Sequence, residues 1–206
     1  MSYAIAGDGT TVWGRDSLEW ETGDVFCLPG GGEVVHIARG GAAVLWIVTN
    51  EPQLAFERVQ APAPRQAALE VVHYPADEIG RQLDAIHRLP PERVMAGGKA
   101  VTLSSAALAA ERTCLPSMTL AMNSLGPGEM QRPHRHNAVA VTLIVQGERC
   151  YSTIDGRRVT WEHLATMITP PGEMHSHQND GDRRALFLIV QDGGLHYHTR
   201  TMGFSY

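Results

Sequence analysis

The chain has 206 residues, of which 43% are hydrophobic and 19% are charged, and its formal net charge is −5. This composition supports a globular core and argues against intrinsic disorder. The sequence contains no run of basic residues interleaved with aromatic side chains, so a nucleic-acid partner is not expected. No apolar stretch reaches the roughly 18 residues of a membrane-spanning helix, so no membrane association is expected either.

The cysteines give a prediction about the compartment. Cys27, Cys114 and Cys150 are an odd number without a CxxC spacing, which is typical of reduced thiols rather than of a disulfide framework. The N-terminus shows no basic segment followed by an apolar run, so we expect no secretory signal. A cytoplasmic location follows from these two observations.

Residues 1–50 are predicted to form short strands separated by turns. Apolar or β-branched segments at 3–6, 10–13, 18–20, 33–37 and 42–49 alternate with glycine-rich turns, and no helical pattern lies between them. Strands at this spacing favour a sandwich or a barrel.

The middle of the chain reads as a helical connector. Residues 61–64 are predicted to be an extended, proline-rich linker. A helix is predicted to begin at Pro75 and to end before Pro90, because acidic residues occupy its first turn and Ile79, Leu83 and Ile86 keep a helical period. Residues 104–112 are a second, short helical candidate.

From residue 118 onward the pattern returns to strands. The predicted strands cover 118–125, 138–145, 150–154, 158–161, 165–169, 175–177 and 185–191, and Asp155-Gly156 is a strong hairpin turn. Residues 147–190 repeat the order of turns, tryptophans and apolar strands seen in residues 7–48. The first half has no counterpart of residues 118–145. We therefore predict three regions: 1–60 as the back half of a barrel, 61–116 as a linker with short helices, and 117–206 as a complete barrel.

Two histidine motifs in the C-terminal region predict a metal site. His134 and His136 are separated by one residue, so on a strand they point to the same face. His175, which follows a Pro-Pro-Gly turn, is the natural third ligand from another strand. Three neutral imidazoles suit iron, copper, nickel or zinc and leave coordination positions open for chemistry.

These residues resemble the two sequence motifs of the cupin superfamily. The first motif is represented by Gly128, His134, His136 and Gly147, with Ala140 at the position usually held by glutamate; the second is represented by Pro170, Gly172, His175 and Asn179. In lacking this glutamate and in the surrounding residues, the sequence resembles gentisate 1,2-dioxygenase-like bicupins. This resemblance implies an all-β fold, a cupin double-stranded β-helix (jelly-roll) barrel preceded by a truncated second cupin and a short helical connector.

The resemblance also implies roles for individual residues. His134, His136 and His175 match the iron(II) ligands, and His177 matches a catalytic histidine that helps to bind or deprotonate the phenol of the substrate. Two positions depart from the family's pattern. Thr142 occupies a position where an arginine often anchors the substrate carboxylate. The N-terminal copy has Val34 where its third ligand would fall and should bind no metal, although His36 is retained.

The predicted function is an Fe(II)-dependent ring-cleaving dioxygenase that acts on gentisate or a related hydroxylated aromatic acid with O2. The alternative is a non-catalytic or degenerate metal-binding cupin module that binds a small ligand, and a third option is a metal-dependent isomerase or hydrolase. Because Thr142 cannot hold a carboxylate as an arginine would, the gentisate interpretation weakens if no arginine or lysine from elsewhere in the chain reaches the pocket. The open edges of a half barrel predict a homo-oligomer. His196 and His198 are predicted to be strand-edge histidines without a metal, and Cys150 a small core residue.

Overall fold

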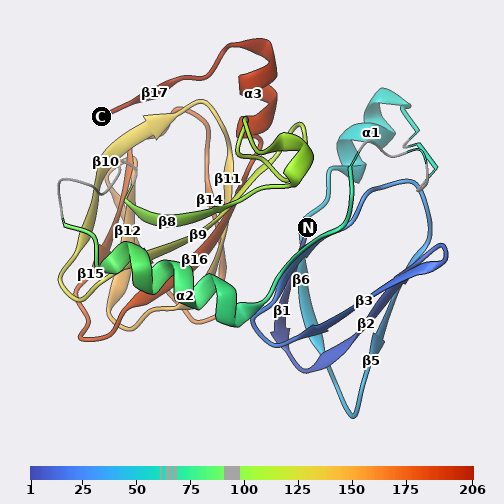
Figure 1. Cartoon of the computed structure of the whole chain (residues 1–206). Coiled ribbons are helices and arrows are strands. Elements are labelled where there is room, and N and C mark those ends of the chain that lie inside the picture. The colour runs from blue at the N-terminus through green and yellow to red at the C-terminus, as the bar shows by residue number, and fades with distance from the viewer. Residues whose placement is uncertain (61, 64–65, 67–68, 91–97) are drawn as a thin grey trace. The chain divides into compact units, whose positions relative to one another are not determined.

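The computed structural model describes the chain except for residues 61, 64–65, 67–68 and 91–97 and the side chains of residues 197 and 198. It divides into two compact units, Met1–Gly80 and Arg81–Tyr206. Antiparallel strands dominate both units, which confirms the predicted all-β class (Figure 1). Within the described part of the chain, no helix is both long and apolar enough to cross a membrane.

The N-terminal unit consists of two small sheets. One has the order β6-β1-β4-β7 and the other the order β3-β2-β5. The strands are β1 (Ser2–Ala6), β2 (Asp8–Trp13), β3 (Asp16–Glu21), β4 (Val25–Cys27), β5 (Val34–Ala38), β6 (Val44–Ile47) and β7 (Val72–Tyr74). Ala4, Trp20 and Phe26 form the centre of its core. The short helix α1 (Glu51–Glu57), which the sequence pattern did not predict, follows β6 and begins with a proline in its first turn.

One edge of this unit is open. Every residue of β5 is exposed, and Val35 and Ile37 keep 45% and 52% of their surface accessible. β5 pairs on one side only, with β2. The apolar residues that the sequence assigned to a barrel strand are therefore uncovered within this unit.

The C-terminal unit is a barrel of two five-stranded sheets (Figure 1). Their orders are β13-β12-β15-β10-β17 and β14-β11-β16-β9-β8. The strands are β8 (Lys99–Leu103), β9 (Thr119–Leu125), β10 (Met130–His136), β11 (Ala140–Gln146), β12 (Cys150–Ile154), β13 (Arg157–Thr160), β14 (Thr166–Thr169), β15 (His175–Asn179), β16 (Ala185–Gln191) and β17 (Phe204–Ser205). Leu125, Ile144, Trp161 and Phe187 lie at the centre of the core.

The helices agree only in part with the sequence prediction. The helix expected after Pro75 is present as α2 (Ala76–His87), and the second candidate is reduced to the 3-10 turn Ala106–Leu108. The prediction of strand-edge histidines at the end of the chain is wrong, because His196 and His198 lie in a helix, α3 (Gly193–Thr199). The helix starts on two glycines because a Cβ on Gly194 would lie only 2.6 Å from the carbonyl oxygen of Pro116.

The predicted linker region also contains an unpredicted strand. β8 pairs with β9 and forms the edge of a barrel sheet, so this part of residues 61–116 contributes to the barrel rather than to a purely helical connector. The extended, proline-rich linker is predicted at residues 61–64, of which 61 and 64 lie outside the described residues. Pro91, the second residue of the predicted helix stop, also lies outside them.

The strand registers confirm the internal repeat. In the N-terminal unit, Thr11 of β2 pairs with both Leu18 and His36; in the C-terminal unit, Ser152 of β12 pairs in the same way with its two neighbours, Val159 and His177. Each residue of the second set follows its counterpart by the same 141 residues. The two units therefore share a three-stranded arrangement, position by position.

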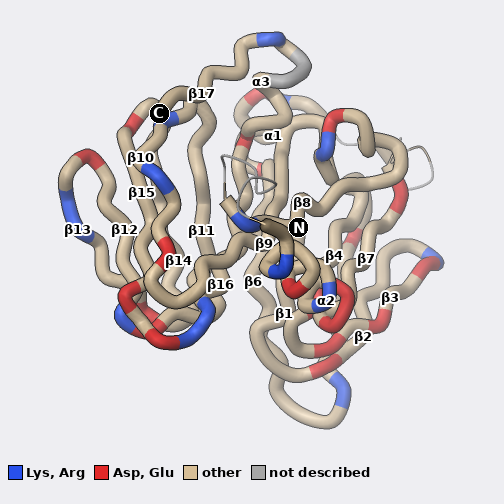
Figure 2. Tube along the Cα trace, turned by 60° about the vertical axis from the view of Figure 1, so that its left-hand side comes forward, with Lys and Arg blue, Asp and Glu red and all other residues tan. Residues whose placement is uncertain are grey.

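The predicted hairpin at Asp155-Gly156 is also confirmed. Both residues have positive φ, 46° and 73°, which is the conformation of a tight type I′ turn between β12 and β13. Figure 2 shows that charged residues in the C-terminal unit lie mainly in such turns and near strand ends, while the barrel strands are otherwise largely uncharged. Charge is thus kept away from the inner face of the barrel.

Candidate metal centre

The strand pairing brings the three predicted ligands together. β10 and β15 are antiparallel neighbours, and His134 lies directly opposite His175. His136 follows two residues later on the same face of β10, as the alternation of a strand requires. The register shifts between Gln131 and His134, so a β-bulge precedes the first histidine. Bulges of this kind change the direction of a side chain at a site.

The three histidines form one compact and buried cluster. Their nearest ligand nitrogens all lie within 4.8 Å of one another. The ring of His175 lies 4.2 Å from that of His134 and 4.7 Å from that of His136, between centroids. The three residues are 3–7% exposed. This is the geometry of a three-nitrogen face for a single cation.

Hydrogen bonds fix the tautomer of each ring. Nδ1 of His134 lies 2.7 Å from the carbonyl oxygen of Arg132, Nδ1 of His136 lies 2.8 Å from that of Ala138, and Nδ1 of His175 lies 2.9 Å from that of Glu173. A carbonyl oxygen only accepts, so each Nδ1 must carry the ring hydrogen. The three Nε2 atoms are therefore left with lone pairs, which is the arrangement that metal-binding histidines use.

A neighbouring amide agrees with this assignment. The side-chain nitrogen of Gln191, at the end of β16, lies 3.2 Å from Nε2 of His136. An amide N–H is a donor, so the Nε2 atom that it faces must be an acceptor. Gln191 therefore lies where it would meet anything bound at the histidine cluster.

Burial keeps the cluster uncharged. Burial lowers the pKa of His134 and His136, and it lowers the pKa of His175 to about 4. The proximity of the other two rings depresses the pKa of His175 further, because two imidazolium ions would repel each other. All three rings are thus neutral near pH 7, which is the protonation state that a cation requires.

His177 lies beside the cluster but is held differently. Its ring centroid is 5.8 Å from that of His175, and the side chain is 3% exposed. Trp161 donates its indole N–H to Oγ of Ser152 at 2.8 Å, and that oxygen is 2.7 Å from Nδ1 of His177. A hydroxyl oxygen has two lone pairs, so Ser152 can accept from Trp161 and still either donate to Nδ1 of His177 or accept from it, and both tautomers of His177 fit this contact. Burial lowers the pKa of His177 to about 3, so the ring is neutral.

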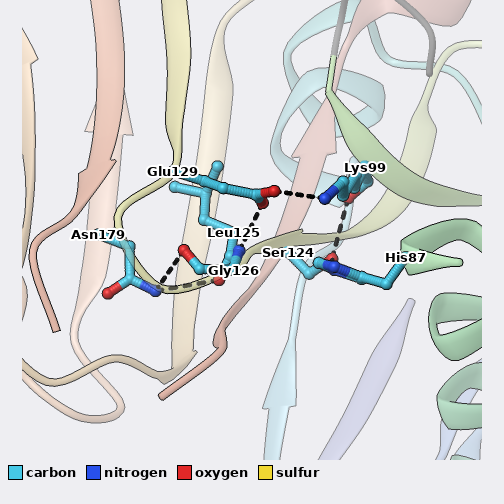
Figure 3. A network of polar contacts seen from close by, with 7 residues as sticks. All are labelled: His87, Lys99, Ser124, Leu125, Gly126, Glu129 and Asn179. Carbon is cyan, nitrogen blue, oxygen red and sulfur yellow. Dashed lines mark hydrogen bonds and ion pairs between the residues drawn. The ribbon is translucent and has the colours of Figure 1, made fainter. Parts of the chain in front are cut away.

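A polar network at the base of the barrel holds the turn that leads into β10 (Figure 3). The ion pair between Lys99 and Glu129 joins β8 to this turn, and the same carboxylate accepts the backbone N–H of Gly126 at 2.6 Å. The amide of Asn179 donates to the carbonyl oxygens of Leu125 and Gly126, both at 3.0 Å. Asn179 thereby ties the end of β15 to the entrance of β10, which carries two of the histidines.

The histidines line a small cavity. Its volume is about 190 Å³, below the roughly 300–1,000 Å³ of typical ligand pockets. Both His177 and Thr142 line this cavity, as the sequence analysis expected of residues near the metal. Sequence reasoning missed several other lining residues, because no local motif marks them: Thr119, Asn123, Thr169, Gln191, Met202 and Phe204.

The C-terminal segment contributes one wall of this cavity. β17 pairs with β10, and the ring of Phe204 stacks on His134 at 5.2 Å between centroids. Phe204 remains 49% exposed, so it lies at the edge of the cavity. This segment limits access to the histidines from its side.

The other candidates from the sequence lie away from the cluster. Cys150 is buried, its thiol donates to Oδ1 of Asn179, and burial raises its pKa to about 11, which fits the predicted core residue. His196 interacts with Asn137 and Thr201 at the surface, and the side chain of His198 is outside the described part of the structure. In the N-terminal unit, His36 has no neighbouring histidine pair among the described residues.

Comparison with known proteins agrees with this architecture. The model of the cupin domain family matches residues 122–191, a span that contains the four histidines that line the cavity. A gentisate 1,2-dioxygenase from Ralstonia sp is 39% identical over 79 residues, which are 38% of this chain and 22% of that enzyme. Over this part of its length the chain is therefore similar to cupin domains and to a gentisate 1,2-dioxygenase.

Two further proteins similar to this chain are also ring-hydroxylated aromatic acid dioxygenases by name. A 1-hydroxy-2-naphthoate 1,2-dioxygenase from Nocardioides sp. (strain KP7) is 36% identical over 70 residues, covering 34% of this chain and 18% of that enzyme. The crystal structure of a salicylate 1,2-dioxygenase from Pseudaminobacter salicylatoxidans aligns with a TM-score of 0.58 and 23% identity, covering 63% of this chain and 37% of that one. The chain therefore matches less than half of the length of these proteins, and at this identity the structural likeness shows the fold.

Proposed function

We propose that the barrel binds one iron(II) ion through Nε2 of His134, His136 and His175, and that the chain is a ring-cleaving dioxygenase for hydroxylated aromatic compounds, with gentisate or a related aromatic acid as substrate. The convergence of three hydrogen-free Nε2 atoms in one buried cavity carries this proposal. The names of the relatives, all dioxygenases of hydroxylated aromatic acids, support the reaction class.

The donor set fits a divalent transition metal. Three imidazole nitrogens suit iron, copper, nickel and zinc, and the described lining of the cavity offers no carboxylate that would favour magnesium or calcium. Iron is proposed because of the resemblance to gentisate 1,2-dioxygenases. When bound, iron(II) supplies open coordination positions and the redox chemistry that joins an electron-rich ring to dioxygen.

The protein's own residues prepare the cavity for an anionic chelating substrate. Three neutral ligands leave the charge of a divalent ion uncompensated, so an adjacent phenolate and carboxylate would balance it. The hydrogen bonds from each Nδ1 to a backbone carbonyl fix the ring planes before metal or substrate arrives. The cost of ordering the site is thereby met during folding.

His177 is proposed to bind the phenol oxygen of the substrate. In this proposal Ser152 donates to Nδ1 of His177 and the ring hydrogen is on Nε2, so the ring offers a hydrogen-bond donor within the cavity. With a pKa of about 3 it would be a weak general base. We therefore assign it donation to a phenolate oxygen rather than removal of the phenol proton.

The substrate carboxylate has no counter-ion from a side chain. The residues described around the cavity include neither arginine nor lysine, and Thr142 offers only a hydroxyl. In this proposal the carboxylate must bind at the metal itself. The same observation favours the second candidate, a non-catalytic metal-binding cupin that holds a small ligand without cleaving it.

We further propose that the chain is a cytoplasmic homo-oligomer. Val44 and Ile47 of β6 are each 50% exposed, as are comparable apolar residues of β5, and such uncovered strands favour pairing with another chain. Cys27, Cys114 and Cys150 are buried and form no disulfide in the structure, which suits a reducing compartment. Light scattering coupled to size-exclusion chromatography tests the assembly, and a monomer at micromolar concentration would contradict it.

Oxygen consumption with iron-loaded protein tests the catalytic proposal. Protein reconstituted with ferrous iron under anaerobic conditions is mixed with oxygenated buffer and gentisate, salicylates or hydroxynaphthoates. We expect oxygen uptake together with the absorbance of a ring-opened product for at least one of these compounds. His134→Ala should abolish both signals, whereas His163→Ala, at an exposed position after β13, should leave them unchanged.

The outcomes separate the two candidate functions. Stoichiometric iron without oxygen uptake on any compound would contradict ring cleavage and support the binding module. Absence of bound iron would contradict the dioxygenase, and failure to bind any divalent transition metal would contradict both candidates.

A further inference from the structure

The cavity at the histidine cluster is lined without a single ionisable side chain other than histidine. Among the described lining residues there is no aspartate, glutamate, lysine or arginine. Apart from the histidines, the polar residues described in the lining are neutral: Thr119, Asn123, Gln131, Thr142, Thr169 and Gln191. Any net charge in this cavity must therefore come from the metal or from the ligand.

Thr142 points to a polar but uncharged partner. It lies on β11, between β14 and β16, and is 1% exposed. Its hydroxyl has no hydrogen-bond partner among the described atoms. A buried hydroxyl without a partner costs about 1–3 kcal/mol, so such groups are normally satisfied by a ligand or by water. A hydroxyl, carbonyl or amide of a ligand would satisfy it.

The nearby cations are directed elsewhere. Arg135 lies between the two histidines of β10 and lines the groove on the other side of that strand, together with Gly172 and Ser205. Lys99 is paired with Glu129, and Arg132 lies over the ring of Tyr206 at 5.0 Å. His136 and Phe204 line both the cavity and the groove, whereas Arg135 lines the groove alone.

We propose that the cavity selects a small, single-ring ligand whose negative charge is confined to the two oxygen atoms directed at the three histidines, and whose other substituents are uncharged hydrogen-bonding groups. This inference rests on the proposed metal site and specifies the substrate class of that site. A second anionic group would enter a buried space without a counter-charge, which is strongly unfavourable. A neutral polar group at the same position would meet Thr142 and the neutral amides instead.

A matched series of salicylates tests this selection without any turnover. Protein loaded with zinc, which has no redox chemistry, is titrated by calorimetry with gentisate, 5-carbamoylsalicylate and 5-carboxysalicylate. The last two have the same shape and differ in charge. We expect the carbamoyl compound and gentisate to bind, and the dicarboxylate to bind roughly tenfold more weakly or worse.

Variants at Thr142 refine the test. Thr142→Val keeps the shape of the side chain and removes the hydroxyl, so it should lower the affinity for gentisate and for the carbamoyl compound by about threefold to tenfold. The affinities of Thr142→Ser should stay within about twofold of the wild type. Thr142→Lys should improve the dicarboxylate relative to the carbamoyl compound. Far-UV circular dichroism and zinc stoichiometry show that each variant is folded and loaded.

Two results would overturn the inference while the proposed function stands. One is equal affinity of normally zinc-loaded wild-type protein for the dicarboxylate and the carbamoyl compound. The other is tight binding of the dicarboxylate that Arg135→Gln abolishes, because this would place the second carboxylate in the neighbouring groove. Failure of the wild-type protein to bind zinc or iron at all would instead overturn the proposed function and this inference together.

Discussion

Both units contain the same hydrogen-bonded trio of a tryptophan, a hydroxyl residue and a histidine. In the N-terminal unit Trp20 donates to Thr11 at 2.9 Å, and Thr11 lies 2.7 Å from Nδ1 of His36. In the C-terminal unit Trp161, Ser152 and His177 form the same contacts at 2.8 and 2.7 Å, 141 residues further along. The trio therefore does not require a metal site, because it persists in a unit that has none among its described residues.

The differences between the copies identify what the C-terminal unit adds. At the same spacing of 141 residues, Val34 stands where the other unit has His175, and Ala38 stands where it has Asn179. His36 is exposed, whereas His177 is buried beside three other imidazoles. The trio thus holds a ring in both units. Among the described residues, only the C-terminal copy has a three-histidine cluster beside that ring and the asparagine that ties the β10 turn.

Removing one histidine from each unit should show the largest difference between the two units, in their effect on metal binding. His175→Ala leaves two imidazoles and an open cavity, so we expect bound metal to fall from about one ion per chain to nearly none. His36→Ala, at the position that corresponds to His177, should leave metal content unchanged. Elemental analysis after reconstitution and desalting measures both, and retention of metal in His175→Ala would contradict the assignment.

Asn179, which corresponds to Ala38 in the N-terminal unit, should contribute to the stability of the C-terminal unit. The amide of Asn179 donates to three backbone carbonyls, those of Leu125, Gly126 and Arg183, and is 1% exposed. Asn179→Ala leaves these oxygens without that donor, and we expect a loss of about 2–4 kcal/mol in the free energy of unfolding. Ala38→Asn, at the corresponding exposed position, should change it by less than about 0.5 kcal/mol. Urea unfolding of the two variants tests the contrast, and equal effects would refute it.

Acid should destabilise the metal-free C-terminal unit more than the N-terminal one. The pKa values of His175 and His177 are lowered to about 4 and about 3, whereas an unfolded histidine titrates near 6.5. As the pH falls through this window, the unfolded chain takes up protons that the folded chain does not, so stability is lost. The expected loss is on the order of 2 kcal/mol for each of these two histidines between pH 7 and pH 4.5. Hydrogen exchange resolved by unit measures it, and a C-terminal unit unaffected by pH would count against neutral buried rings.

The smallest expected effect concerns the hydroxyl of the trio. Ser152→Ala should cost about 1 kcal/mol and allow the ring hydrogen of His177 to redistribute between its nitrogens. Ser152→Thr should keep both hydrogen bonds and the stability of the wild type, because a threonine, Thr11, makes the same contacts at the equivalent position of the N-terminal unit. Nitrogen NMR of the imidazole distinguishes the tautomers, and a ring hydrogen on Nδ1 in the wild type would contradict the proposed donation from Ser152 to Nδ1 of His177.

Local patterns predicted the ligands because strand alternation is a local rule. A His-x-His pair needs only the pleat of β10 to share a face, and the β-bulge before His134 does not disturb that relation. The Asp155-Gly156 turn and the start of α2 also depend on neighbouring residues alone. The repeat allowed the position of His177 relative to His36 to be recognised before any contact was known.

The remaining features depend on contacts between distant residues. Gln191 and Asn123 reach the cavity only because β16 pairs with both β11 and β9, and no motif marks either residue. The strand β8 is five residues long and pairs on one side, so its sequence signal is weak. The helix α3 begins at Gly193 and Gly194, although glycine more often ends a helix. Gly194 is needed there because its backbone packs against the carbonyl oxygen of Pro116.

Anomalous diffraction from crystals grown with ferrous iron under anaerobic conditions would test the central claim most directly. Data collected on both sides of the iron absorption edge locate iron without reference to activity. The account predicts one peak per chain, about 2.1 Å from Nε2 of His134, His136 and His175, and none beside His36. A peak ligated by other residues, or iron-loaded crystals without a peak at the cluster, would contradict it.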